Sequence, residues 1–319
     1  MSATMRVLGH PAAGMLLGVA VLVAVVWRLG TGPVVHGLAS IGPAPLAAAA
    51  LIGVPVTLCC AWRWSLVARG LGIALSLPAA LAGCYRAQFL NTALPGGVLG
   101  DVNRAVRHGR DAGSPGRAAG AVALERFAGQ VVQLVLATGV LLVVPSPARA
   151  GLRSAATVVG VVLVVGGLLA LAAPRGAAAR RFRRRWTAVD AVRLALLDRG
   201  RWPGILLTSV GVLVGCVVTF IVAARAVGVT APSSRLLPLA LIVLVAMAVP
   251  ANVAGWGPRE GAAAWAFGTA GLGADLGLAT AVAYGVLVFV AALPGAVVLV
   301  GVRRRREEPL VTTEGVVHG

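Results

Sequence analysis

The chain has 319 residues, of which 59% are hydrophobic and 12% are charged, and its mean hydropathy is +0.92. Soluble globular domains carry about 25% charged residues, so this composition excludes a soluble enzyme and a disordered chain and indicates an integral membrane protein. Basic residues outnumber acidic ones by 28 to 10, and all of the basic residues are arginine. Cytoplasmic loops of a multi-pass protein explain this excess, and we expect no nucleic-acid partner.

Six apolar runs are near or above the roughly 18–20 residues that a helix needs to cross a bilayer. They are residues 11–29, 44–62, 118–144, 153–173, 203–224 and 276–301. Two further apolar regions, 77–100 and 235–272, are interrupted by proline, glycine and charge. We interpret the first run as an uncleaved signal anchor, because no small-residue cleavage site follows it.

The distribution of arginine predicts the orientation of these spans, because short cytoplasmic loops are rich in basic residues. The expected cytoplasmic segments are 63–70, 104–117, the 174–202 connection with its nine arginines, and the tail from Arg303 to Arg306. The expected external segments are 30–43, 145–152 and 225–235.

This sidedness constrains the two interrupted regions. Residues 77–103 must enter and leave on the cytoplasmic side, and residues 235–272 must enter and return outside. The predicted fold is therefore an all-α integral membrane protein of the cell membrane, with six full transmembrane helices and two re-entrant hairpins at about 77–103 and 235–272. Both termini are expected in the cytoplasm.

We expect one polytopic membrane domain over residues 1–302, followed by a disordered cytoplasmic tail at 303–319. The domain divides into repeat A, 11–144, and repeat B, 153–301. The 174–202 connection within repeat B has apolar residues at steps of three and four, which predicts a basic amphipathic helix in the headgroup layer; the alternative is a solvated arginine loop. These apolar residues are Phe182, Trp186, Val189, Val192 and Leu196.

The two interrupted regions share the spacing Pro-x4-Gly-x3-Arg, in copies that lie 155 residues apart. The copies are Pro95, Gly100 and Arg104, and Pro250, Gly255 and Arg259. Each copy follows two full spans and precedes one, so an odd number of crossings per half inverts the second copy relative to the first. Interrupted segments at matching positions of two inverted halves point to a transport site.

These residue types suit an anion site inside a membrane. Proline and glycine release backbone groups from the helical ladder, and such breaks persist in a bilayer only where protein or a water-filled cavity surrounds them. Half-helix N-termini then present N–H groups to an anion. Arg104 and Arg259 add bidentate donors for the same oxygens.

Acidic residues are scarce, and three of them accompany these motifs. Asp101 and Glu260 lie within the motifs, and Glu125 lies about eight residues into the third span. A charge at such depth costs about 2.5–3.5 kcal/mol on insertion scales, so Glu125 needs a partner. We expect Arg104 or Arg86 to be that partner, since the neighbouring Arg126 points to another face of the helix.

Each charged residue also has a structural interpretation. Glu125 is compatible with a buried structural ion pair, and Arg259 with Glu260 is compatible with an extracellular surface pair. Asp101 is compatible with a cap on a helix that begins near Val102, which leaves Arg104 at the cytoplasmic surface. Arg63, between Trp62 and Trp64, is interpreted as an interfacial anchor. The cysteines and histidines have no metal-type spacing, so no metal or cofactor is expected.

The stretch Gln88-Phe89-Leu90-Asn91-x3-Pro95-Gly96-x3-Gly100-Asp101-x2-Arg104 resembles a signature of the lysylphosphatidylglycerol synthetase transmembrane, or flippase-like, family. Glu125-Arg126, Gly255-x-Gly257-x-Arg259-Glu260 and Leu293-Pro294-Gly295 are similar to it too. The resemblance covers about 40–302 and implies a polytopic helical domain with re-entrant segments that moves lipids between leaflets. It further implies aminoacylated phosphatidylglycerol as the lipid of the best-known members, in which a soluble aminoacyl-transferase domain is fused to the membrane domain. We expect no such transferase in this chain.

The sequence therefore favours a lipid translocase without catalytic residues, acting on an anionic or aminoacylated phospholipid or a lipid-linked intermediate. Arg104 and Arg259 are expected to contact phosphate, and Asp101, Glu125 and Glu260 to hold a cationic substituent or take up protons. The alternatives are a membrane-embedded enzyme on lipid-linked substrates, with these carboxylates as acid and base, and a non-catalytic subunit of a cell-envelope complex. Lipid is the expected partner, with a homo-oligomer also compatible. The candidate substrate-binding residues are Asn91, Pro95, Gly100, Asp101, Arg104, Glu125, Arg126, Asn252, Gly255, Gly257, Arg259 and Glu260.

Overall fold

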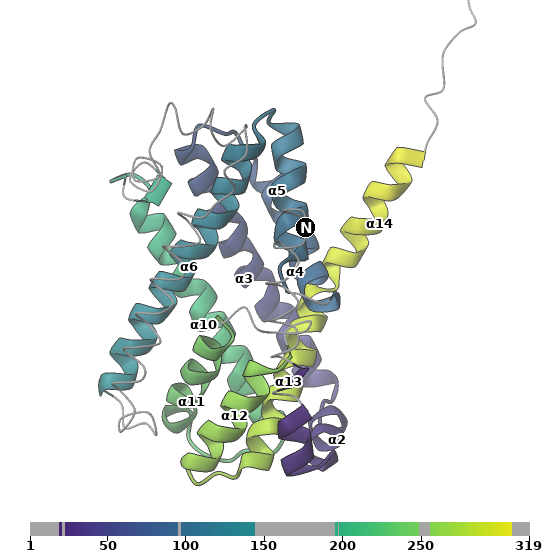
Figure 1. Cartoon of the computed structure of the whole chain (residues 1–319), viewed down its shortest axis with the longest axis vertical. Helices are drawn as coiled ribbons and strands as arrows, with labels where there is room; N and C mark the ends of the chain where they lie inside the picture. Colours follow the sequence, from purple (N-terminus) through teal and green to yellow (C-terminus); the bar gives the residue numbers. More distant parts are fainter. Residues whose placement is uncertain are drawn as a thin grey trace, which may run out of the picture.

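The computed structural model describes residues 19–20, 23–94, 97–143, 195–196, 198–248 and 256–307. The described ranges contain ten labelled helices, and residues 23–29, at the end of the predicted first span, are helical as well (Figure 1). Residues 11–18 and 21–22 of the predicted first span, the whole span 153–173 and most of the 174–202 connection lie outside the described residues, so the predicted amphipathic helix stays a prediction.

Four helical segments of the described part are long and apolar enough to cross a membrane. They are α3 (Pro43–Gly70), α6 (Pro115–Val143), α10 (Trp202–Ala226) and the segment Ala274–Val300, which belongs to α13 and α14. The predicted spans 44–62, 118–144, 203–224 and 276–301 coincide with them. The main difference is the end of the second span, because α3 continues to Gly70 and so carries Arg63 inside the helix.

The last predicted span is two helices, α13 (Ala274–Ala292) and α14 (Pro294–Glu307), separated at Leu293. Pro294 has no N–H to continue the ladder, so the first helix ends just before it. Gly295 brings α14 close to α4 (Leu77–Ala93), because a Cβ there would overlap the carbonyl of Tyr85. The helix α14 includes Arg303 to Arg306, so the tail predicted to be disordered from 303 is helical as far as Glu307.

Both interrupted regions form helical hairpins. In the first hairpin, α4 packs against α5 (Leu99–Asp111), and Gly100 allows the close approach because a Cβ there would overlap the carbonyl of Ala87. In the second hairpin, α11 (Ser233–Ala246) packs against α12 (Pro258–Thr269). The open ends of the second hairpin meet, since Arg235 Nη2 donates to the carbonyl of Ala270 at 3.1 Å.

The two hairpins occupy opposite halves of the molecule, the first in the upper half and the second in the lower half of Figure 1. The C-terminal ends of α3, α5 and α14 and the N-terminal ends of α6 and α10 lie toward the upper end. The arginine-rich segments 63–70, 104–117 and 303–306, which the sequence assigned to one side of the membrane, therefore lie toward one end of the described part. At the other end lies α2 (Gly32–Ala39), a short helix within the predicted external loop 30–43.

The lower core is built where α10, α11, α12 and α13 meet. Phe220 of α10 contacts the rings of Phe267 from α12 and Tyr284 from α13, with centroids 6.3 and 5.8 Å apart. A second core lies between α3, α4 and α6 and includes Trp64, Val67 and Cys84. Each hairpin thus packs on spanning helices that hold its polar side chains in place.

Candidate functional site

Five charged side chains from three helices meet where the first hairpin packs on the spanning helices. This first cluster consists of Arg63 of α3, Asp101 and Arg104 of α5, and Glu125 and Arg126 of α6. Arg63, Arg104 and Glu125 are buried, with exposed fractions of 5%, 3% and 1%. Three positive and two negative charges therefore share one site, which leaves one positive charge in excess.

Glu125 is the centre of the first cluster. Its Oε1 accepts hydrogen bonds from Arg63 Nε at 2.9 Å and Arg63 Nη2 at 2.6 Å, and its Oε2 accepts one from Arg104 Nη2 at 2.8 Å. Charge-assisted bonds of this length are the strong kind. Of the two partners predicted for Glu125, Arg104 is confirmed. Arg86 is not a partner of Glu125, since its Nε donates to Asn103 Oδ1 at 3.0 Å.

Arg63 is not the interfacial anchor that the sequence suggested. Its guanidinium lies inside the helix bundle, where Nη1 also donates to Ser209 Oγ of α10 at 3.1 Å. Gly129 of α6 makes room for it, because a Cβ there would lie 2.9 Å from Arg63 Nη1 and Nη2. The depth of Glu125 in the third span shows that it needs a buried cation, but it does not single out Arg63 among the arginines of the chain.

Asp101 holds the start of α5 against α4 and α6. Its carboxylate lies 2.8–2.9 Å from Arg126 Nη2 and 3.0 Å from Arg104 Nη2, and it accepts a hydrogen bond from Asn91 Nδ2 at 3.2 Å. Asn91 Oδ1 in turn accepts the Gly100 N–H at 2.7 Å. The helix begins at Leu99 with Val98 as its N-cap, so the alternative interpretation, in which Asp101 caps a helix that begins near Val102, is wrong.

Two aromatic residues that the sequence did not single out complete the first cluster. The guanidinium carbon of Arg104 lies 4.6 Å from the centroid of the Trp64 ring, a cation–π distance. The imidazole of His108 meets the same indole edge-on, with centroids 5.4 Å apart. Arg104 is therefore enclosed, and not at the cytoplasmic surface. Arg104 Nε is buried without a hydrogen-bond partner.

The second cluster consists of Arg259 and Glu260 at the start of α12. Glu260 Oε1 accepts a hydrogen bond from Arg259 Nε at 2.8 Å, and Oε2 accepts the N–H of the N-cap residue Gly257 at 2.6 Å, so the Glu260 side chain caps the start of its own helix. Both residues are buried, with exposed fractions of 4% and 0%, so the interpretation as a surface pair is wrong. The Arg259 guanidinium carbon lies 4.8 Å from the Trp256 ring centroid.

Two glycines shape the second cluster. Gly257 has φ of +119°, a conformation that a side chain rarely adopts, and it directs the chain into α12. Gly285 of α13 leaves space for Arg259, because a Cβ at that position would overlap the guanidinium. The site therefore depends on packing between the second hairpin and the last span.

The candidate residues fall into three groups. Asn91, Gly100, Asp101 and Arg104 of the first hairpin meet Glu125 and Arg126 of α6, and Gly257, Arg259 and Glu260 meet in the second hairpin. Pro95, Asn252 and Gly255 lie outside the described residues. The two motif arginines differ in setting, since Arg104 pairs with a glutamate of another helix and Arg259 with the residue next to it.

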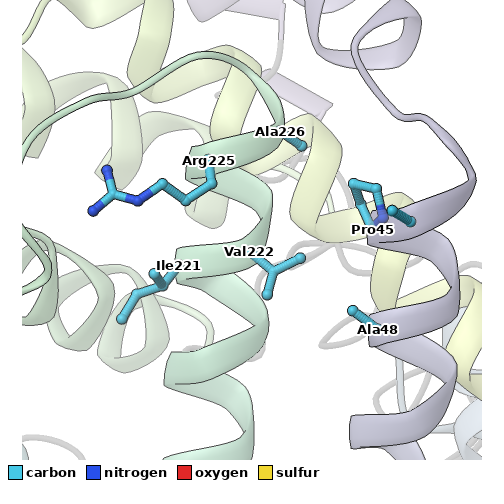
Figure 2. Close-up of a pocket in the computed structure, with 7 residues that line it drawn as sticks. Pro45, Ala48, Ile221, Val222, Arg225 and Ala226 are labelled. Carbon is cyan, nitrogen blue, oxygen red and sulfur yellow. The ribbon is translucent and has the colours of Figure 1, made fainter.

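A separate hollow of about 390 Å³ opens between the start of α3 and the end of α10. Figure 2 shows Pro45 and Ala48 of α3 facing Val222 of α10, whereas the Arg225 guanidinium points away from α3. The hollow is almost wholly apolar, and none of the candidate residues lines it. In the described ranges, no group of three His, Cys, Asp or Glu side chains is arranged to hold a metal ion.

Comparison with known proteins identifies the family. Neither the curated proteins nor the solved structures give a match to this chain. The family model described as the lysylphosphatidylglycerol synthase TM region matches residues 13–295, nearly the whole of the sequence. The ordered motifs around Arg104, Glu125 and Arg259 lie inside that range. The chain therefore belongs to the lysylphosphatidylglycerol synthase TM region family and is a multi-pass membrane protein.

Proposed function

We propose that this protein is a lipid translocase, which moves an anionic or aminoacylated phospholipid, or a lipid-linked intermediate, between the leaflets of the cell membrane. The observation that carries the proposal is the pair of buried arginine–carboxylate clusters on two helical hairpins in opposite halves of the molecule. The family is named after a phospholipid, lysylphosphatidylglycerol, and this supports a lipid as the substrate.

The energetics of burial support a functional role for these charges. Charged side chains inside a membrane protein are costly, and they mark substrate pathways by default. Replacing a buried ion pair with well-packed apolar residues is often neutral or stabilising, so stability alone does not favour five charged groups in the first cluster. Binding of a headgroup phosphate that passes between the hairpins would explain why these arginines are present.

The arrangement of the hairpins supports alternating access. We propose that each hairpin re-enters the membrane from the side on which its open end lies, the first from the cytoplasm and the second from outside. The two halves then form an inverted repeat, with both termini in the cytoplasm. Hairpins that approach the midplane from opposite sides expose a headgroup site to each leaflet in turn.

The first cluster supplies an element that can change partners. Arg104 contacts both Glu125 of α6 and Asp101 of its own helix, whereas Arg63 links Glu125 to Ser209 of α10. A phosphate oxygen that replaces one carboxylate at Arg104 weakens the contact between the first hairpin and α6. Headgroup binding is in this way coupled to movement of the hairpin.

A reconstituted-vesicle assay tests the proposal. Purified protein in vesicles that contain tail-labelled phosphatidylglycerol should make inner-leaflet label accessible to a membrane-impermeant quencher faster than empty vesicles do. Mass spectrometry of the recovered lipid should show unchanged masses, since we assign no chemical step to the protein. No transfer above empty vesicles contradicts translocation, and a changed lipid mass points to an enzyme.

A further inference from the structure

In both clusters, the groups that could bind a positive part of a headgroup already have partners within the chain. All three carboxylates already bind donors of the chain through both of their oxygens. Glu125 is bound by Arg63 and Arg104, and Glu260 by Arg259 and the Gly257 N–H. Asp101 is bound at one oxygen by Arg104 and Arg126 and at the other by Arg126 and Asn91. An ammonium group therefore meets no carboxylate oxygen here that lacks a donor of the chain, and it has to compete with an arginine or a backbone N–H for each of them.

The aromatic faces are occupied as well. A tryptophan face is the other common binding site for an ammonium group. The ring of Trp64 is covered by Arg104, and that of Trp256 by Arg259, with guanidinium carbons 4.6 and 4.8 Å from the ring centroids. The arginines therefore occupy the tryptophan faces on which the ammonium group of an aminoacyl headgroup could otherwise bind.

Donors, in contrast, remain. The first cluster contains three arginines and two carboxylates and so keeps one positive charge in excess. Arg104 Nε is buried at a residue that is 3% exposed, and it has no hydrogen-bond partner. The side chain of Arg126 is 49% exposed, so the cluster is open to a ligand at this end.

From this imbalance we infer that the site selects headgroups that carry phosphate without a compensating amine, and discriminates against aminoacylated ones. The inference rests on the proposed function and narrows it to the phosphatidylglycerol class. One negative phosphodiester neutralises the excess charge of the first cluster. A lysyl ester adds two ammonium groups to that phosphodiester and so increases the positive charge in a poorly hydrated site.

The test compares headgroups on the unmodified protein. Vesicles contain tail-labelled phosphatidylglycerol, lysyl-phosphatidylglycerol or phosphatidylcholine, and inner-leaflet label is followed with a membrane-impermeant quencher. We expect phosphatidylglycerol to move at least about tenfold faster than the lysyl ester and than phosphatidylcholine, which corresponds to about 1.4 kcal/mol. Equal or faster movement of the lysyl ester overturns the inference and leaves the proposed function standing. If no lipid moves, the proposed function fails.

A second arm separates a lipid phosphate from a free one. Labelled inorganic phosphate is supplied outside the same vesicles, and its uptake is measured together with lipid movement. We expect lipid movement without phosphate uptake. Phosphate uptake without lipid movement overturns both the inference and the proposed function.

A charge-neutralising variant tests the residues themselves. Arg126→Gln leaves two arginines against two carboxylates, so we expect the preference for phosphatidylglycerol over phosphatidylcholine to fall by about tenfold. Arg110→Gln removes the same charge from an exposed position in the last turn of α5, outside the cluster, and should keep the preference. An unchanged preference in folded Arg126→Gln, judged by its elution as a single species in detergent, overturns the assignment to this cluster.

Discussion

Arg63 and Glu125 are 62 residues apart in the chain and meet at 2.6 Å inside the helix bundle. This contact joins α3 to α6, and through Ser209 it reaches α10. Three of the four candidate spans are therefore tied together by one glutamate and one arginine. The same glutamate also holds the first hairpin through Arg104, so its removal affects both the fixed spans and the hairpin.

Glu125→Gln should destabilise the protein by about 3–5 kcal/mol, because it leaves the buried guanidiniums of Arg63 and Arg104 without their shared counter-charge. The thermal midpoint in detergent, followed by the loss of the monodisperse species, measures the effect. Asp275→Asn is the matched control, since Asp275 is exposed in the first turn of α13. A midpoint as high as that of the control contradicts the structural role of the pair.

Gly100→Ala should separate α4 from α5. The added Cβ would overlap the backbone of Ala87, which is not free to move aside, and overpacking of this kind costs about 1–3 kcal/mol or more. Gly116→Ala is the control, because a Cβ at Gly116 meets nothing within 4 Å. We expect the first variant to lower both the thermal midpoint and lipid movement and the second to change neither. Equal behaviour of the two variants contradicts the tight crossing.

Arg259→Lys should reduce lipid movement by about tenfold or more, although it keeps the positive charge. Lysine lacks the planar fork that binds Glu260 through Nε and stacks on Trp256. The vesicle assay provides the rates, and Arg235→Lys serves as the control because Arg235 only bridges the open end of the second hairpin. Wild-type rates in Arg259→Lys would show that charge alone suffices there.

Cysteines placed at the two ends of the molecule should react from opposite sides of the membrane. Asp111 ends α5 and Thr230 lies between α10 and α11, and both are exposed. Asp111→Cys should react with an impermeant maleimide in inverted vesicles, and Thr230→Cys in right-side-out vesicles. The native cysteines, which are buried or half-buried, set the background. Labelling of both variants from one side would falsify the proposed topology.

The sequence alone was sufficient to predict the four long apolar spans and the two hairpins of the described part, and the grouping of Asn91, Gly100, Asp101 and Arg104. It did not predict α2 or the break at Leu293. Hydropathy identifies spans, and prolines and glycines identify breaks, because both depend on local composition. The motif spacing, in contrast, carried no information on which side chains meet across helices. Arg63 was misplaced because a hydropathy window ends a span at the first charge, although α3 continues to Gly70 and its arginine meets a glutamate.

The aromatic parts of the site were out of reach for a similar reason. The sequence offers Trp64 and Trp256 many arginines as possible partners, and only the folded chain shows that Arg104 and Arg259 cover their rings. The glycines that make room for guanidiniums, Gly129 and Gly285, lie in a chain with 42 glycines. Hydropathy can be read from a window of the sequence, whereas the close packing of a glycine against a guanidinium cannot.

The joint at Leu293 has a consequence for how the protein can move. Beyond it, α14 rests on α4 of the first hairpin, while α13 remains packed against α12 of the second. The second half of the sequence thus ends in a helix that packs on the first half, while the rest of that half packs on itself. A swing of either half must carry part of its neighbour with it, so the halves cannot rock as two independent blocks.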